Sequence, residues 1–332
     1  MCNHLPAPGG LVVLRNTRTT ILNSGTPDEK RAEISDYFHK TYSIDEQLYE
    51  TLNNDAAFYL RAEPLRHPLI FYLGHTAVFY INKLIVARII EERINPHFES
   101  MFAIGVDEMS WDDLSDKNYD WPTVAEVKAY RDQVRHRVND VIETLPLALP
   151  IDWDNPFWAL MMGIEHQRIH LETSSVIIRR MPIDQVQQLP LWDICSDTGD
   201  APHNQLLDVP GGEVRIGKSK DHPLYGWDNE YGRHSFKVED FSASKFLVSN
   251  HEYHEFVEAG GYQDETYWTE EGRRWLQFSK AKQPLFWIKD NGSYRFRTMA
   301  QEIAMPWDWP VEVNYLEAKA YCNWQAAQTG LP

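Results

Sequence analysis

Residues 165–172 read EHQRIHLE, and this stretch indicates both the fold of the amino-terminal half and its chemistry. Each helical residue turns the chain by about 100°, so His166 and His170 lie about 40° apart on one face. Two imidazoles spaced in this way can bind one metal ion. Glu172 lies about 240° from His166, so it is a poor third ligand. It is better interpreted as a hydrogen-bond acceptor for a ligand histidine or as a surface charge.

A third ligand is expected from another helix, and His75 is the best candidate. It lies within residues 68–90, the most apolar stretch of the chain, and Phe79 and Asn82 share its helix face. Metal sites of helical bundles are built from side chains on facing helices. Two ordinary alternatives compete with this hypothesis. A His-x3-His pair is more often solvated than bound to metal, and a lone histidine in an apolar helix is usually a hydrogen-bonded core residue.

Four long helices are predicted in the first 190 residues. Thr26, Pro27 and Glu29 form a helix start, because threonine caps the helix, proline fits its first turn and glutamate completes a capping box. Thr123 and Glu126 repeat the capping pattern. A long polar connection is expected over 95–121. The expected helices cover about 26–52, 68–93, 123–145 and 157–180, which favours a four-helix bundle.

The character of the chain changes near residue 190, where proline and glycine become frequent. Helices are expected behind Asn250 and Asn314. They should cover about 250–259 and 315–328, among short strands at 213–217, 235–241, 294–298 and 310–313. The expected fold class is therefore α+β multidomain. The expected parts are an irregular leader (1–25), a four-helix bundle with the metal site (26–190), a linker (191–210) and a second domain that is cut short (211–332).

Composition excludes several function classes. The formal net charge of −17 over 332 residues argues against a nucleic-acid partner, which would need a basic face. Three scattered cysteines are too few for a disulfide framework. Polar groups interrupt the most apolar stretch, no signal peptide is evident, and a cytoplasmic protein without a membrane span is expected. No phosphate-binding loop, nucleophilic serine motif or activated cysteine is present.

Several long strings resemble a known family. In the first half they are residues 67–77 (HPLIFYLGHTA), 93–96 (RINP), 106–113 (VDEMSWDD) and 166–175. In the second half they are residues 225–232 (YGWDNEYG), 257–262 (VEAGGY) and 305–310 (MPWDWP). The chain resembles the non-haem iron sulfoxide synthases over roughly residues 20–332. Within that family the ovothiol-biosynthesis 5-histidylcysteine sulfoxide synthases are most similar, and the ergothioneine-pathway enzymes rank second.

This resemblance implies a DinB-like bundle followed by a formylglycine-generating-enzyme-like domain, related to C-type lectins. It implies an Fe(2+) site made by His75, His166 and His170. The implied reaction joins the sulfur of L-cysteine to carbon 5 of the L-histidine imidazole and uses O2 to oxidise the sulfur to a sulfoxide. Residues 228–230 (Asp228, Asn229 and Glu230), with Phe79 and Asn82, are expected to line the substrate cleft. The catalytic tyrosine of the family has no match in this sequence, because it lies in a part of the second domain beyond residue 332.

Three competing functions stay open. The first is a hercynine-type sulfoxide synthase of ergothioneine biosynthesis. The second is a truncated, non-catalytic bundle that binds metal, which the expected shortening of the second domain favours. The third is a zinc hydrolase of the DinB-like thiol-transferase kind, since three imidazoles also suit zinc.

Overall fold

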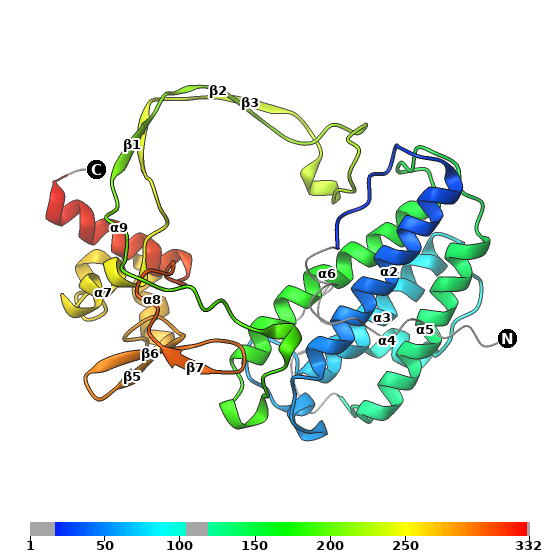
Figure 1. The fold of residues 1–332 in the computed structure, drawn as a ribbon, viewed down its shortest axis with the longest axis horizontal. Coiled ribbons are helices and arrows are strands. Elements are labelled where there is room, and N and C mark those ends of the chain that lie inside the picture. Colours follow the sequence, from blue (N-terminus) through cyan, green and yellow to red (C-terminus); the bar gives the residue numbers. More distant parts are fainter. Residues whose placement is uncertain (1–16, 104–118, 331–332) are drawn as a thin grey trace. The chain divides into compact units, whose positions relative to one another are not determined.

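The structure is a computed structural model that describes residues 17–103 and 119–330. The chain folds as two units (Figure 1). The first unit contains Met1–Asp193 and Ile216–His234, and the second contains Ile194–Arg215 and Ser235–Pro332. The acidic runs at 107–108 and 112–113, and the string at 106–113, lie outside the described residues.

Four long helices build the first unit, as predicted. They are α2 (Pro27–Tyr49), α3 (Leu69–Val86), α5 (Val124–Thr144) and α6 (Phe157–Arg179). Helix α3 contacts both α5 and α6 and is buried along most of its length, which explains why apolar residues cover nearly all of its faces. By length and composition it is the one helix among the described residues that could span a membrane, yet 78% of it is buried in the bundle.

The capping signals start helices where the sequence predicted them. The Thr26 hydroxyl accepts the N–H of Glu29 at 3.3 Å, and the Glu29 carboxylate accepts the N–H of Thr26 at 2.9 Å. Thr123 and Glu126 form the same pair of bonds at 3.2 and 2.8 Å. These bonds satisfy N–H groups that the first helical turn leaves without partners.

The end of α3 differs from the prediction. The helix stops at Val86 instead of continuing to about residue 93. Arg88 adopts a left-handed conformation (φ 57°), and the N–H groups of Ile89 and Ile90 both turn back to the carbonyl of Leu84. The backbone therefore closes the helix with its own hydrogen bonds, which apolar spacing cannot reveal.

The connection predicted over 95–121 contains a short helix, α4 (Pro96–Met101). It starts at Asn95, whose side chain accepts the N–H of Phe98 at 3.2 Å. The buried carboxylate of Glu99 accepts the N–H groups of Ile94 and Asn95 at 2.9 and 3.0 Å. Short 3-10 helices also lie among the described residues of this unit: η1 (Asp55–Tyr59), η4 (Ile183–Gln185), η5 (Pro190–Trp192) and η6 (Asp228–Glu230).

Short strands and three helices make up most of the second unit. The helices are α7 (Asn250–Glu258), α8 (Glu270–Ser279) and α9 (Tyr315–Thr329), with one 3-10 turn, η7 (Glu265–Tyr267). Strand β1 (Leu206–Val209) pairs antiparallel with β4 (Phe241–Ser244). Strand β2 (Gly212–Ile216) pairs with β3 (His234–Val238). The third sheet is antiparallel and contains β5 (Trp287–Asp290), β6 (Ser293–Arg297) and β7 (Glu302–Ala304).

Several predictions for this half need correction. The strand expected at 235–241 is divided between β3 and β4, and at the break the Asp240 carboxylate accepts the N–H of Gly211 at 2.6 Å. The strand expected at 310–313 forms only an isolated bridge between Ser249 and Pro310, since proline has no N–H to donate. Strand β1 lies within the linker expected over 191–210. Helix α8 was not predicted, although its first turn is capped by Thr269.

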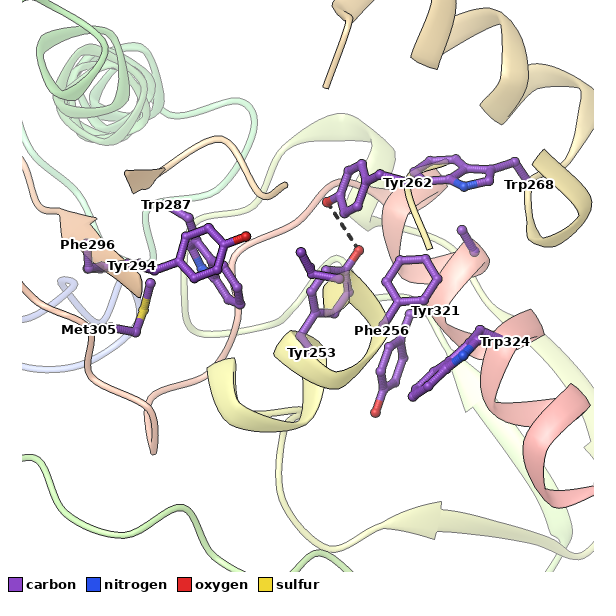
Figure 2. Packing of buried hydrophobic residues seen from close by; sticks show 12 residues of the cluster. Tyr253, Phe256, Tyr262, Trp268, Trp287, Tyr294, Phe296, Met305, Tyr321 and Trp324 are labelled. Carbon is purple, nitrogen blue, oxygen red and sulfur yellow. Dashed lines mark hydrogen bonds between the residues drawn. The ribbon is translucent and has the colours of Figure 1, made fainter. Parts of the chain in front are cut away.

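Aromatic side chains form the core of the second unit. Trp268, Trp287 and Trp324 are buried there together with several tyrosines and phenylalanines (Figure 2). The hydroxyl groups of Tyr253 and Tyr262 lie 3.4 Å apart, and Tyr262 donates to the buried carboxylate of Glu317 at 2.6 Å. Three tryptophans thus fill this core, and Trp275, Trp307 and Trp309 pack against it.

Residues 216–234 pack with the bundle, although they were expected to belong to the second domain. The N–H of Leu22 donates to the carbonyl of Pro223 at 2.7 Å, and Ile21 bridges to Leu224. The ring of Trp158 on α6 lies 4.8 Å from the ring of Tyr225. The local composition of residues 216–234 does not indicate that they belong to the first unit.

Candidate metal centre

Three histidines from two helices converge in the interior of the bundle. His75 lies on α3, while His166 and His170 lie one turn apart on α6. The Nε2 atom of His166 is 3.3 Å from Nε2 of His75 and 3.1 Å from Nε2 of His170. Among the described residues this is the one group of three or more candidate metal-binding side chains, and its ligand atoms all lie within 4.8 Å of one another. The structure thus brings together the three histidines that the sequence singled out.

The spacing of these nitrogens fits a shared metal ion. Nitrogen ligands lie about 2.1 Å from such an ion, so two of them are about 3.0 Å apart at a right angle and about 3.4 Å apart at a tetrahedral angle. The separations of 3.1 and 3.3 Å fall between these values. Two of the three separations in this group therefore match those of nitrogens bound to one ion.

Burial keeps the imidazoles of α6 neutral. It lowers the pKa of His170 to about 3 and that of His166 well below its ordinary value, and the neighbouring histidines lower both further. A neutral imidazole has a lone pair to give to a metal, whereas a protonated one has none. Both histidines of α6 are accordingly held in their metal-binding form at neutral pH.

A backbone carbonyl fixes the tautomer of His75. Its Nδ1 atom lies 2.6 Å from the carbonyl oxygen of Phe102, and because a carbonyl can only accept, Nδ1 must be the donor. Nε2 then carries the lone pair of the ring, and it faces His166. The Nδ1 atoms of His166 and His170 are buried and have no hydrogen-bond partner among the described residues, so packing sets the orientation of their rings.

Aromatic rings provide that packing. Phe79 stacks on His166 with ring centres 3.5 Å apart and planes within 6°, and Phe71 stacks on His75 at 5.2 Å and 16°. The ring of Tyr72 lies 5.8 Å from that of His170. The ammonium group of Lys83 lies 4.8 Å from the centre of the Phe79 ring. The Phe79 ring therefore contacts both the Lys83 cation and the His166 imidazole. Phe71, Tyr72 and Phe79 are all buried, so apolar rings cover this side of the site.

The other predicted site residues have different surroundings. The Asn82 amide donates to the carbonyl of Glu99 at 2.9 Å and accepts from Arg93 at 2.7 Å, so it joins α3 to α4. Residues Asp228–Glu230 form an exposed 3-10 turn, η6, in which the Glu230 carboxylate accepts the N–H of Trp227 at 2.6 Å. Only Phe79 of the predicted substrate residues touches the histidines. The exposed side chain of Glu172 agrees with its interpretation as a surface charge.

Sequence reasoning missed three neighbours of the histidines: Phe71, Tyr72 and Phe102. Phe71 precedes His75 by four residues, and the helical spacing that selected Phe79 could also have found it. Phe102 comes from beyond the end of α4, and nothing in the sequence indicates that its carbonyl reaches His75.

Comparisons with known proteins match each half to a different family. The DinB superfamily matches residues 37–174, and the sulfatase-modifying factor enzyme 1-like domain matches residues 195–332. The chain therefore combines a DinB-like helical domain with a second domain, of mixed helix and sheet, like that of the sulfatase-modifying factor. This is the predicted fold class.

Three similar curated proteins have related names. A hercynine oxygenase of Mycolicibacterium smegmatis is 28% identical over 284 residues, which cover 83% of this chain and 61% of that protein. Ergothioneine biosynthesis protein 1 of Neurospora crassa is 26% identical over 209 residues, which cover 58% of this chain and 24% of that protein. A hercynine oxygenase of Mycobacterium tuberculosis is 35% identical over 102 residues, covering 30% and 24%. The chain thus spans less than two thirds of the length of each of these relatives. Their names agree with the second-ranked expectation, an enzyme of the ergothioneine type.

Proposed function

We propose that this protein is a non-haem iron sulfoxide synthase, which joins a cysteine sulfur to an imidazole carbon and oxidises the sulfur with O2. The observation that carries the proposal is the buried group of His75, His166 and His170, whose nitrogens are spaced for one ion. The similarity to proteins named hercynine oxygenase supports the same class of reaction.

The stoichiometry requires no external reductant. Forming a C–S bond from a C–H and an S–H group removes two electrons and two protons, and forming the sulfoxide removes two more electrons. One O2 accepts these four electrons, places one oxygen atom on sulfur and leaves the other as water. The product mass is therefore the sum of the two substrates plus one oxygen minus two hydrogens.

The donor set suits this chemistry. Three neutral imidazoles would leave a bound Fe(2+) ion its full charge, which lowers the pKa of a thiol ligand, and would leave positions open for substrates and O2. Around that position, His75 is held by the Phe102 carbonyl and His166 by the face of Phe79. These contacts fix the ligands before substrates arrive, so the reacting groups can be brought together without rearranging the bundle.

The imidazole substrate distinguishes two branches of the proposal. The strings at 106–113 and 305–310 favour L-histidine with bonding at carbon 5, as in ovothiol biosynthesis. The names of the relatives favour hercynine with bonding at carbon 2, as in ergothioneine biosynthesis. For the substrate cleft we propose Phe79, Asn82 and Asp228–Glu230; Phe79 has the strongest support, because it already lies on a histidine of the site.

Anaerobic titration with Fe(II), followed by a mass-spectrometric assay, tests the proposal. Wild type should bind one iron per chain and His75→Ala should lose most of that affinity. Adding O2 with cysteine and either histidine or hercynine should give the predicted mass, and fragmentation of the product locates the new bond. Iron binding without product from either pair would reject the synthase proposal.

A non-catalytic metal-binding bundle is the second candidate, because the three histidines could hold a metal ion without any reaction taking place there. It predicts that metal raises the melting temperature while cysteine and imidazole substrates cause no O2 uptake. Substrate-dependent O2 uptake would exclude it. Metal analysis after purification at low oxygen separates iron from the zinc of a hydrolase.

A further inference from the structure

A buried ion pair lies in the same bundle as the histidines. Asp45 of α2 and Arg131 of α5 have almost no exposed surface, and Nη2 of Arg131 lies 2.8 Å from Oδ2 of Asp45. Such a pair rarely stabilises a protein more than apolar side chains of the same size would. Here Oδ1 of Asp45 has no hydrogen-bond partner among the described residues, and Nε of Arg131 has none but lies 4.0 Å from Oε1 of Glu46. The hydrogen bonds of the pair are therefore incompletely satisfied.

The pair is joined to both helices that carry the histidines. Nη1 of Arg131 donates to the carbonyl of Leu73 and to the hydroxyl of Thr76 on α3, both at 2.7 Å. On α6, the Gln167 amide donates to Oδ2 of Asp45 at 3.0 Å and accepts from the Tyr80 hydroxyl at 2.9 Å. One carboxylate and one guanidinium thus connect all four long helices of the bundle.

The connections reach the residues that directly follow two of the histidines. Thr76 follows His75, and Gln167 follows His166. Successive helical residues point about 100° apart, so the histidines and their neighbours occupy adjacent faces of the same two helices. A rotation of α3 or α6 about its axis would therefore move a histidine, and the same rotation would break the hydrogen bond of Thr76 or Gln167 to the ion pair.

We propose that Asp45, Arg131, Thr76 and Gln167 form a positioning clamp, which sets the rotation of α3 and α6 and so holds the Nε2 atoms of His75 and His166 at metal-binding distance. The inference rests on the metal site of the proposed function, not on its reaction. The four clamp residues are positioning residues, because they touch each other and the helix backbone and none of them contacts the histidine nitrogens.

Measuring metal affinity distinguishes a network that positions the metal ligands from one that only stabilises the fold. Thr76→Val and Gln167→Met each remove the hydrogen bonds of one clamp side chain and keep the side-chain volume close to that of wild type. Tyr42→Phe is the matched control, because the Tyr42 hydroxyl donates to the carbonyl of Arg131 at 2.8 Å in the same buried region but links only α2 to α5. The probe is Co(II), whose dissociation constant and visible absorption spectrum are measured at fixed pH alongside the melting temperature of the metal-free chain.

The two clamp variants should bind Co(II) about 10-fold or more weakly, in the range found when groups that orient metal ligands are removed, and their spectra should change. All three variants should lower the melting temperature of the metal-free chain, because each loses buried hydrogen bonding. The Co(II) affinity of Tyr42→Phe should nevertheless stay within about 2-fold of wild type. Equal Co(II) affinity and spectra in both clamp variants would overturn the clamp. Wild type that binds Co(II) but gives no sulfoxide with Fe(II) would overturn the proposed function and leave the clamp standing.

Discussion

Gly163 gives a sharp test of the packing around the site. It lies on α6, one turn before His166, and an added Cβ would lie 2.4 Å from two ring carbons of Tyr80. Ordinary contact begins near 3.4 Å, so the ring would have to move by about 1 Å. Tyr80 has little freedom to move, because it is 1% exposed, packs edge-on against Phe38 and donates to Gln167.

Two effects of opposite sign compete in Gly163→Ala. Alanine gains about 1 kcal/mol of helix propensity over glycine. Overpacking a filled core costs about 1–3 kcal/mol, and losing the Tyr80–Gln167 hydrogen bond costs about 1 kcal/mol more. The net loss in the free energy of unfolding should therefore be about 1–3 kcal/mol. A loss of about 2 kcal/mol, the middle of this range, would lower the melting temperature by roughly 4–8 °C.

Urea unfolding of the metal-free chain, followed by helical circular dichroism, measures this loss. Gly212→Ala is the control: no atom lies within 4 Å of its added Cβ, so its change should stay within about 0.5 kcal/mol. In a Tyr80→Leu background the obstacle is gone, and the same Gly163→Ala change should become stabilising. A Gly163→Ala protein as stable as wild type would refute the reasoning, because it would show that the Tyr80 ring can move away from the added methyl group without loss of stability.

Three further predictions concern the metal and the pH dependence. His166→Ala should reduce metal affinity at least as strongly as His75→Ala, because His166 lies next to both other histidines; competition with a chromogenic chelator measures this, and wild-type affinity would contradict it. Zn(II) at 100 times its dissociation constant should raise the melting temperature of wild type by about 5–10 °C, and excess EDTA should reverse the rise; an unchanged melting temperature would count against the site. Burial lowers the pKa of His39, and the hydrogen bond of its ring to Asn139 opposes part of this shift. As the pH falls, His39 therefore takes up a proton in the unfolded chain before it does so in the folded chain. The free energy of unfolding should then fall as the pH drops below about 6.5. His39→Gln should lose less stability between pH 7.5 and 5.5 in urea titrations, with Arg135, Asp36 and Glu143 left in place; an equal loss would show that other groups govern the change.

The bundle was predictable because its signals are local. Thr26 and Thr123 with their glutamates mark helix starts within four residues, and an apolar face of constant spacing marks the helix that follows. The pair of His166 and His170 is likewise local. His75 could be selected from the sequence because a histidine is unusual in so apolar a helix.

Long-range contacts were not predictable in the same way. The Phe102 carbonyl reaches His75 from 27 residues away, and Asp45 meets Gln167 across 122 residues. In the second unit, strand boundaries depend on contacts such as Gly211 with Asp240 rather than on alternation. The path of 216–234 back to the first unit follows from tertiary packing alone.

The distance along the chain between the two ligand helices has a consequence of its own. His75 and His166 are 91 residues apart, so an ion held by both would act as a cross-link that closes a long loop. The chain-entropy estimate for a cross-link of that span is about 4–5 kcal/mol. After a protease nick between α4 and α5, the ion would become one of the contacts between two fragments that also pack through α3 and α6, so a chelator should weaken their association.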